Sequence, residues 1–304
     1  MAEKNKVELI KESLQTPIDK PVENDAANTQ TEKNNAGFVG EALNEDEKIN
    51  ELETQSKPEI VVLVGFEGYG KTSFVSSFYF QFLSNGKVGQ YEIVDSDTLI
   101  GFERRLYLRR VQSEQQSPSV TWRTVRGEPY LLTMRLRNET TGEKLIVLSD
   151  RSGEDYTRYA TQRDSVKGDK VLQNADCILF FVDCSALVGN NVLVMSEKYK
   201  DLAENLSANK MLKDDAEIVI LFNKIDLIND NNRDLYIKEK EVLTQTLSDK
   251  LGRKITRIFE VVSNKEDNEE LLKVLEYIVS QKKSIVQTKS VSTELDWIKS
   301  IFNL

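Results

Sequence analysis

A glycine-rich segment followed by a lysine and a threonine is the part of this sequence best suited to chemistry. Residues 65–72 read GFEGYGKT, which matches the pattern GxxxxGK[ST]. Glycines let a loop wrap closely around phosphates, and a helix starting there would present free N–H groups and its positive dipole end. Lys71 would place a charge near the β and γ phosphates, and the Thr72 hydroxyl could ligate Mg²⁺. The segment therefore predicts a site for a nucleoside triphosphate.

The residues around this loop predict the elements that would hold it. The preceding run EIVVLVG is apolar and β-branched, which is typical of a strand buried on both faces. Helical signals follow from Lys71 to about Leu83 and end at Gly86. Lys71 is also a candidate catalytic residue, and the Glu67 side chain is expected to point to solvent. The loop residues predicted to bind the nucleotide are Glu67, Gly68, Tyr69, Gly70, Lys71, Thr72 and Ser73.

A second group of candidate residues follows another buried strand, AEIVILFN, which ends in Asn223. Asp226 could accept two hydrogen bonds from guanine, whereas adenine would leave this carboxylate unpaired. The aliphatic stem of Lys224 could lie over the base plane. Alone, this NKID segment is equally compatible with an ordinary turn at the end of a strand. After the phosphate loop, it favours a guanine nucleotide.

Four motifs, in this order and spacing, resemble the Ras-like, translation-factor-related class of P-loop GTPases. The resemblance covers about residues 58–285. More narrowly, the run Gly-Phe-Glu-Arg at 101–104 and the run Asp-Arg-Ser-Gly-Glu at 150–154 are similar to a bacterial double-GTPase-type family linked to conflict systems. The four motifs are GFEGYGKT at 65–72, DRSG at 150–153, NKID at 223–226 and SNK at 263–265.

This resemblance implies a magnesium site and a contact to the γ-phosphate. Asp150 would hold Mg²⁺ through a water, and the Gly153 N–H would sense the γ-phosphate. A threonine before the second strand would complete the metal shell together with Thr72. Thr124 is the first choice and Thr121 the second, although a surface role is about equally compatible with either one alone.

The resemblance also assigns the remaining contacts to the nucleotide. Ser263 and Asn264 would touch the guanine. The expected cofactors are GTP or GDP and Mg²⁺. Outside the loop, the predicted nucleotide-binding residues are Gly153, Asn223, Lys224, Asp226, Ser263, Asn264 and Lys265, and the predicted metal ligands are Thr72, Thr124 and Asp150.

One position departs from the pattern of the class, which usually has a glutamine directly after DxxG to orient the attacking water. Here that residue is Glu154. A carboxylate could orient or deprotonate water, but it would also repel the γ-phosphate. Glu154 is therefore a candidate catalytic residue in a reaction expected to be slow or dependent on a protein activator.

An arginine could supply positive charge to the transferred phosphate. Arginines on a helix more often form a solvated face, so this simpler interpretation is favoured for the arginines in the run ERRLYLRR at 103–110. The candidates are Arg104, Arg105, Arg109, Arg110, Arg123, Arg126 and Arg151.

Strands alternating with helices predict an α/β protein with the three-layer P-loop NTPase fold. The sheet would be mostly parallel with one antiparallel edge strand, because TMRLRNETTGEKLIVLSD resembles a hairpin. Helices are expected near 194–212, 233–252 and 267–282, and RIFEVV as the last strand. The GTPase domain would span 58–288 with a long switch-region insertion at about 86–129, in which LIGFERRLYLRR could be helical.

The composition is that of a globular protein with unusual limits on its chemistry. Of the 304 residues, 39% are hydrophobic and 30% charged. The lack of histidine excludes Ser-His-Asp catalysis and histidine-ligated metals. The two cysteines, Cys177 and Cys184, lie in an apolar run and are expected to be buried thiols.

The two ends of the chain differ from the predicted domain. Residues 1–57 carry 7 lysines and 13 acidic residues, so most of the net charge of −9 lies there. We expect a disordered acidic tail at 1–57 and an amphipathic segment at 289–304. The acidity argues against nucleic-acid binding, and no apolar run is long enough for a membrane span or signal peptide. A cytoplasmic location is the default expectation.

These residues predict a Mg²⁺-dependent GTPase that acts as a conformational switch on an unidentified protein effector or activator. The alternative is a GTP-binding scaffold that does not hydrolyse its nucleotide, which Glu154 favours. An ATPase or nucleotide kinase is disfavoured by NKID. Release of phosphate from GTP and from ATP would separate the three.

Overall fold

The computed structural model describes residues 40–43, 58–107, 124, 126–127, 130–265 and 269–280. These residues belong to one compact unit, Phe38–Leu304, and the other unit, Met1–Gly37, lies outside the described residues. The predicted C-terminal segment 289–304 lies outside them as well. No helix in the described ranges is long and apolar enough to cross a membrane.

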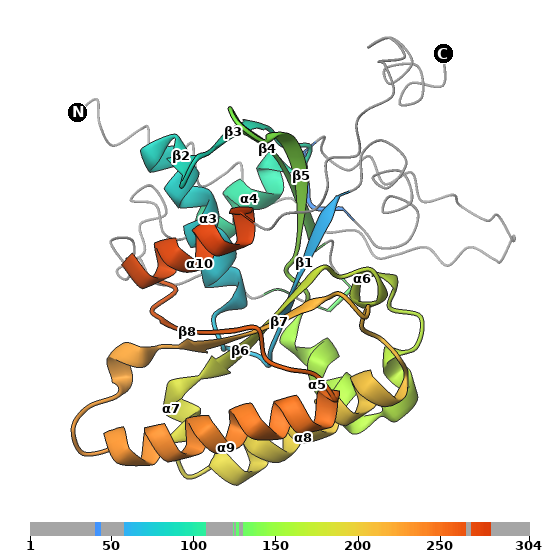
Figure 1. Ribbon diagram of the computed structural model, residues 1–304, viewed down its shortest axis with the longest axis vertical. Coiled ribbons are helices and arrows are strands. Elements are labelled where there is room, and N and C mark those ends of the chain that lie inside the picture. The colour runs from blue at the N-terminus through green and yellow to red at the C-terminus, as the bar shows by residue number, and fades with distance from the viewer. Residues whose placement is uncertain are drawn as a thin grey trace, which may run out of the picture. The chain divides into compact units, whose positions relative to one another are not determined.

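Eight strands form one sheet, in the spatial order β2-β3-β4-β5-β1-β6-β7-β8 (Figure 1). The strands β5, β1, β6, β7 and β8 are parallel to their neighbours among these five, as expected for strands joined by helices. The bounds are β1 Glu59–Val64, β2 Lys87–Val88, β3 Tyr91–Asp95, β4 Leu131–Asn138, β5 Gly142–Ser149, β6 Cys177–Asp183, β7 Glu217–Asn223 and β8 Arg257–Val261.

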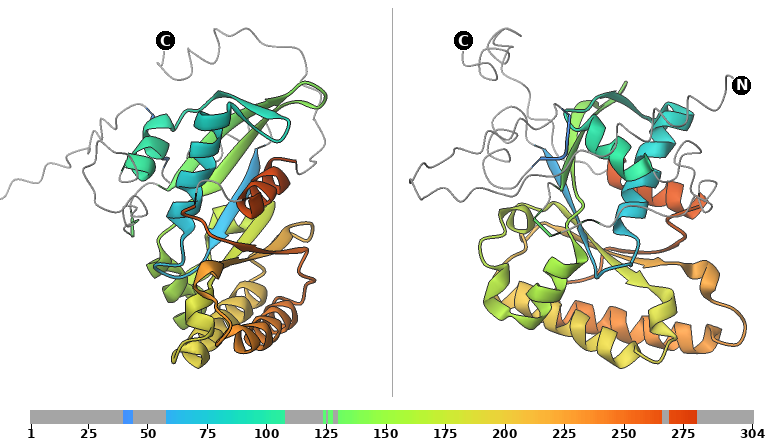
Figure 2. Two further views of the ribbon diagram at one scale, coloured as in Figure 1. Left: turned by 90° about the vertical axis from the view of Figure 1, so that its left-hand side faces the viewer. Right: turned by 180° about the vertical axis from the view of Figure 1, so that it is seen from behind.

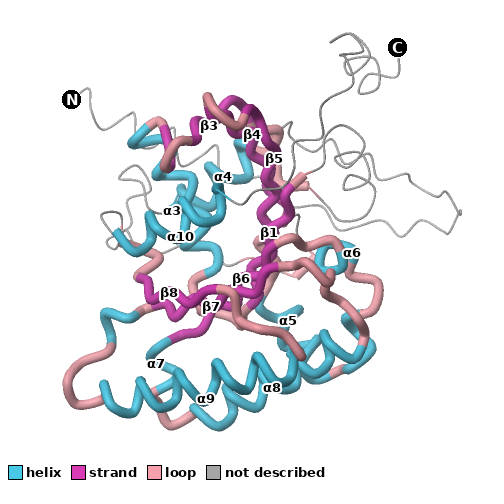
Figure 3. Tube along the Cα trace, viewed as in Figure 1, coloured by secondary structure: helices cyan, strands magenta, loops and turns pink. Residues whose placement is uncertain are grey.

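Helices cover both faces of the sheet, which makes the predicted three layers (Figures 2 and 3). α8 and α9 run side by side beneath one face, and α3, α4 and α10 lie on the other. The bounds are α3 Lys71–Asn85, α4 Leu99–Leu106, α5 Gly153–Thr161, α6 Lys170–Gln173, α7 Cys184–Leu187, α8 Val192–Ala208, α9 Arg233–Leu251 and α10 Glu269–Ser280, with the 3₁₀ turns η3 Arg163–Val166 and η4 Ile225–Leu227.

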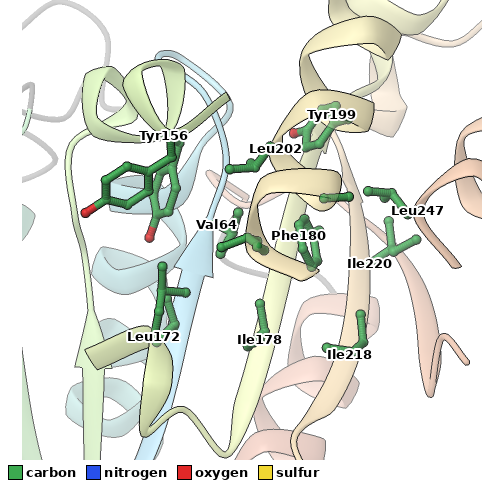
Figure 4. Close-up of a cluster of buried hydrophobic side chains, with 14 of the residues drawn as sticks. Val64, Tyr156, Leu172, Ile178, Phe180, Tyr199, Leu202, Ile218, Ile220 and Leu247 are labelled. Carbon is green, nitrogen blue, oxygen red and sulfur yellow. The ribbon is translucent and has the colours of Figure 1, made fainter. Parts of the chain in front are cut away.

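The continuous apolar run of β1 is explained by burial on both faces. Alternate side chains point to opposite sides of a strand, so Val62 and Val64 join one core cluster and Val61 and Leu63 the other. Figure 4 shows the first cluster, in which Val64 lies among side chains from α5, α8 and the neighbouring strands. This central strand delivers the phosphate loop from a rigid base.

The antiparallel edge is larger than the single strand predicted. The hairpin β4–β5 is present, but β3 pairs with β4 and β2 pairs with β3, so three strands run antiparallel at this edge. The two additional strands come from the start of the segment 86–129, which the sequence predicted to be an insertion. Most of their side chains are exposed, which explains why their sequence carries a weak strand pattern.

Residues 40–43 are ordered, although the sequence predicted a disordered tail through residue 57. Leu43 and Leu131 exchange backbone hydrogen bonds of 2.8 and 3.1 Å. Ala42 is buried, and Gly101 N–H donates to Gly40 C=O at 3.0 Å. Gly40, Ala42 and Leu43 thus lie against β4 and α4, so part of the predicted tail packs on the described domain.

Candidate functional site

The phosphate loop, residues 65–72, connects the buried end of β1 to the first turn of α3. Gly70 precedes the helix with φ 92° and ψ 17°, a left-handed conformation that residues with a Cβ atom rarely adopt. A Cβ on Gly70 would also lie 2.0 Å from the Asn223 side-chain nitrogen. Both the backbone and the packing therefore require glycine, and the loop can lie directly against the strand-end residue Asn223.

Lys71 is buried at the base of this loop. Its ammonium donates to the carbonyl oxygens of Gly65 at 2.6 Å and Phe66 at 3.1 Å. Burial lowers its pKa from 10.5 to about 8, although the nearby charges of Asp150 and Glu67 act in the opposite direction. The charge of Lys71 is thus poorly solvated, and an anion brought into the loop would stabilise it.

Three oxygen-bearing side chains from separate segments converge beside the loop. Thr72 and Thr124 have their hydroxyl oxygens 3.0 Å apart. Thr72 donates to Oδ1 of Asp150 at 3.1 Å, and Thr124 donates to Oδ2 of the same carboxylate at 3.2 Å. Asp150 follows β5 directly and is completely buried. The two predicted threonine ligands and the predicted aspartate are therefore neighbours.

The carboxylate of Asp150 also carries an ion pair. Arg105 of α4 donates from Nε to Oδ2 of Asp150 at 2.7 Å, and it is only 8% exposed. The expectation of a solvated arginine face is therefore wrong for Arg105. It is right for Arg104, whose side chain is 62% exposed and pairs with Glu41. The candidates Arg109, Arg110 and Arg123, like Thr121, lie outside the described residues.

Arg151, the second residue of DRSG, belongs to a buried polar network. Its guanidinium lies 3.1 Å from Asp169 and donates to the hydroxyl groups of Tyr130 and Tyr159. Tyr159 in turn donates to Asp169 at 2.9 Å. Burial disfavours the charge of Arg151, but Asp169 and the tyrosines raise its pKa above the usual value. This network fixes the loop between β5 and α5.

Gly153 packs this same loop against the phosphate loop. A Cβ on Gly153 would lie 2.2 Å from the backbone nitrogen of Glu67, so only glycine allows the contact. Gly153 is the first residue of α5, whose N-cap Ser152 accepts a hydrogen bond from the Glu154 N–H at 3.3 Å. The Glu154 side chain itself is exposed.

A cavity of about 250 Å³ lies between these segments. Its size suits the phosphate part of a nucleotide better than a whole ligand. Glu154 does not line it, and Glu67 does so from an exposed position. The lining residues are Glu67, Gly68, Tyr69, Gly70, Lys71, Thr72, Ser73, Thr124, Arg151, Ser152 and Gly153.

The predicted guanine-binding residues follow β7 and β8, next to the phosphate loop. Asn223 is buried, donates to the Tyr69 carbonyl at 2.9 Å and accepts from the Ser263 N–H at 2.9 Å. The Asn223 side chain thus joins the end of β7 to the phosphate loop and to the segment after β8. The Asn264 and Lys265 side chains are exposed.

Lys224 and Asp226 lie at the solvent side of this region. Lys224 adopts a left-handed conformation with φ 63°, and its ammonium lies 2.5 Å from Oδ2 of Asp183. Asp226 is exposed in η4, and no partner for its carboxylate is found within the described ranges. Burial raises the pKa of the Tyr69 phenol to about 12, and the charge of Asp183 adds to this shift.

Comparison with known proteins assigns this arrangement to a family. A family model described as Double-GTPase 2 matches residues 59–278, which is most of the chain. This chain belongs to the Double-GTPase 2 family. This membership confirms the resemblance to P-loop GTPases that the motifs predicted. A search of curated proteins gives no match.

Solved structures of translation factors are similar to this Double-GTPase 2 protein. The bacterial selenocysteine-specific elongation factor EF-Sec shares 12% identity with a TM-score of 0.37, over 73% of this chain and 28% of the other. Elongation factor SelB from Methanococcus maripaludis, in complex with the GTP analogue GPPNHP, shares 13% identity with a TM-score of 0.38. The match covers 77% of this chain and 36% of the SelB chain. The chain therefore spans about a third of the length of these proteins.

The residues beside the loop of this Double-GTPase 2 protein fit a magnesium ion. Mg²⁺ prefers hard oxygen ligands, and it is usually bound by one or two carboxylates together with phosphates and water. Thr72, Thr124 and the buried Asp150 offer such oxygens within hydrogen-bond distance of one another. Within the described part of the chain, no group of three or more acidic or cysteine side chains is suited to a metal, so Asp150 is the one carboxylate that this set of oxygens offers.

The sequence did not single out one residue and one contact of this site. Asp183 ends the buried strand β6 beside Asn223, and a carboxylate at that edge of a parallel sheet is a signal that could have found it. The ion pair of Arg105 with Asp150 joins residues 45 positions apart, and no local pattern reveals such a contact.

Proposed function

We propose that this protein binds GTP together with Mg²⁺, hydrolyses it, and changes conformation between the two nucleotide states. Membership of the Double-GTPase 2 family supports GTP binding. The observation that carries the finer proposal is the convergence of Thr72, Thr124 and Asp150 beside the buried Lys71. These four residues come from three separate segments, and phosphate with Mg²⁺ is the ligand whose chemistry uses all of them.

The side chains have distinct roles in this proposal. The Lys71 ammonium donates to oxygens of the β and γ phosphates in place of the loop carbonyl oxygens. Because its charge is poorly solvated, this change of hydrogen-bond acceptor is favourable. Thr72 and Thr124 would hold Mg²⁺ through their hydroxyl oxygens, and Thr72 would keep Asp150 as its hydrogen-bond acceptor. When bound, Mg²⁺ neutralises negative charge on the phosphates during transfer to water.

Two of these contacts connect the γ-phosphate to segments that can respond to its loss. Thr124 lies in the 86–129 insertion, and the Gly153 N–H begins α5 next to Glu67. A γ-phosphate would hold both segments to the phosphate loop, and hydrolysis would remove that attachment. Such a change could alter the surface offered to an effector or activator protein.

The test measures nucleotide binding and phosphate release separately for the full chain. We expect tight binding of GTP in Mg²⁺, weak binding of ATP, and slow release of phosphate from GTP. A preference for ATP, or no measurable affinity for any guanine nucleotide in Mg²⁺, would contradict the proposal. Thr72→Val serves as the matched loss-of-metal variant, because it keeps the shape of the side chain.

The position of Glu154 favours a second candidate, a GTP-binding scaffold without hydrolysis. Its side chain is exposed, does not line the cavity, and stands where the class usually has glutamine. GTP binding without any release of phosphate would support this alternative. Glu154→Gln removes the charge that repels the γ-phosphate. If residue 154 governs turnover, this variant should release phosphate from GTP at a measurable rate.

A further inference from the structure

We propose that Arg105 is a built-in counter-ion for the metal-site residue Asp150, and that its charge opposes Mg²⁺ binding. The helix α4 would then set how strongly nucleotide binding depends on the metal. This inference rests on the proposed function, since it assigns Mg²⁺ to Thr72, Thr124 and Asp150. It adds a residue from the insertion that directly affects the metal site.

The geometry places a positive charge beside the metal site. Arg105 Nε lies 2.7 Å from Oδ2 of Asp150, and its Nη1 donates to the Gly101 carbonyl at 3.0 Å. Asp150 is completely buried and Arg105 nearly so. Water therefore screens this pair weakly, and a charge at this distance strongly affects any second cation bound beside the same carboxylate.

Separate contacts hold α4 in place, so Arg105 does not depend on its own ion pair to reach Asp150. Phe102 stacks on Tyr79 with ring centroids 5.1 Å apart, and the Tyr79 hydroxyl donates to Glu103 at 2.7 Å. The Ser76 hydroxyl donates to the Arg105 carbonyl at 2.9 Å. These contacts attach α4 to α3, the same helix that begins with Lys71.

Gly101 attaches the other side of α4. A Cβ on Gly101 would lie 2.7 Å from the Ala42 backbone nitrogen and 2.9 Å from Leu132, so glycine allows the helix to approach β4 closely. The run Gly-Phe-Glu-Arg at 101–104 therefore docks the helix, and the following residue, Arg105, contacts the metal-site carboxylate. A movement of α4 would withdraw the guanidinium from Asp150.

The sign of the expected effect follows from the charges. With Arg105 in place, the pair with Asp150 is neutral overall, and a divalent cation gains little attraction from it. Without the arginine, Asp150 presents a full negative charge to Mg²⁺. If instead the main role of Arg105 were to orient Asp150 for the metal, its removal would weaken Mg²⁺ binding.

The experiment compares the affinity of a non-hydrolysable GTP analogue in EDTA and in saturating Mg²⁺. The dissociation constant in EDTA divided by the dissociation constant in Mg²⁺ measures how strongly binding depends on the metal. Arg105→Gln, which can still donate a hydrogen bond but has no charge, should raise this ratio about tenfold. Arg105→Lys should stay near wild type because it keeps the charge, and Arg104→Gln, exposed on the same helix, should leave the ratio unchanged.

An unchanged or lower ratio in Arg105→Gln would overturn the role of Arg105, while binding by the wild type would still support the proposed function. No binding of the analogue by the wild type would instead contradict the proposed function itself. Should Arg105→Gln not fold in EDTA, adding Asp150→Asn should restore folding, because the double change leaves no unpaired buried charge. If urea unfolding shows that the double variant does not fold either, that result would also overturn the inference.

Discussion

The two halves of the candidate site are built differently. On the phosphate side, Lys71, Thr72 and Asp150 are held by hydrogen bonds to one another or to the loop, and Asp150 is completely buried. On the base side, Asp226 is exposed and Lys224 is tied only by its ion pair with Asp183 within the described ranges. Asn223 is the rigid connection between the halves.

This difference indicates how binding free energy and selectivity are divided. A preformed group loses little conformational entropy when a ligand arrives, whereas an exposed side chain must be ordered first. The phosphate side should therefore supply most of the affinity for any nucleoside triphosphate. The base side should decide between guanine and adenine, because a carboxylate left unpaired by the wrong base is costly.

The largest effect should come from Lys71→Met. Loss of a buried charge facing the phosphates should reduce GTP and GDP affinity about 1,000-fold, or about 4 kcal/mol. Burial already disfavours the ammonium, so the free energy of unfolding should fall little. Nucleotide titration and urea unfolding measure the two effects, with exposed Lys87→Met as control. Wild-type affinity in Lys71→Met would show that the cavity binds something else.

Asp226→Asn should affect the base side alone. We expect GTP affinity to fall about 100-fold while weak ATP affinity changes little, because the variant removes the acceptor for two guanine donors. Competition between the two nucleotides measures the selectivity. Asp230→Asn, an exposed carboxylate four residues later, is the control. An equal loss for ATP and GTP would indicate that Asp226 supports the fold and does not recognise the base.

The sequence predicted the central part of the fold because burial there leaves strong local patterns. After Glu59, β1 is apolar since both its faces are covered. α3 ends just before Gly86, whose φ of 70° and hydrogen bond to the Phe82 carbonyl form a left-handed cap. The short strands β2 and β3 were missed because most of their side chains face solvent.

For the site, the sequence indicated residue types but not contacts made by tertiary packing. It ranked Thr124 before Thr121, but a surface role stayed about equally compatible with either one alone, since both are threonines in one unpatterned segment. The structure places Thr124 beside Asp150, and Thr121 lies outside the described residues. It also treated Arg104 and Arg105 alike. The docking of α4 buries one and exposes the other, and this depends on Gly101 and Phe102 packing against distant segments.

Thr124→Val should have a moderate effect that appears only with the metal. Losing one oxygen ligand should weaken binding of a non-hydrolysable GTP analogue about tenfold in Mg²⁺ and hardly at all in EDTA. Thr246→Val, whose hydroxyl donates only to its own helix at Val242, is the control. A similar loss in EDTA would mean that Thr124 supports the loop and does not ligate the metal.

The smallest effect should come from Asp183→Asn on the base side. Lys224 is 36% exposed, so solvent screens its ion pair with Asp183, and such pairs contribute about 1 kcal/mol at most. We therefore expect GTP and GDP affinities to fall equally, by about fivefold, as the Lys224 stem loses its fixed position over the base.

Because charge screening reduces this contribution, the difference between Asp183→Asn and wild type should shrink at high salt. Asp164→Asn, which breaks the surface pair with Lys167, is the control. A loss of a hundredfold or more would contradict the comparison between the two halves. It would mean that Lys224 is as preorganised as Lys71, and that the base side contributes to affinity as strongly as the phosphate side.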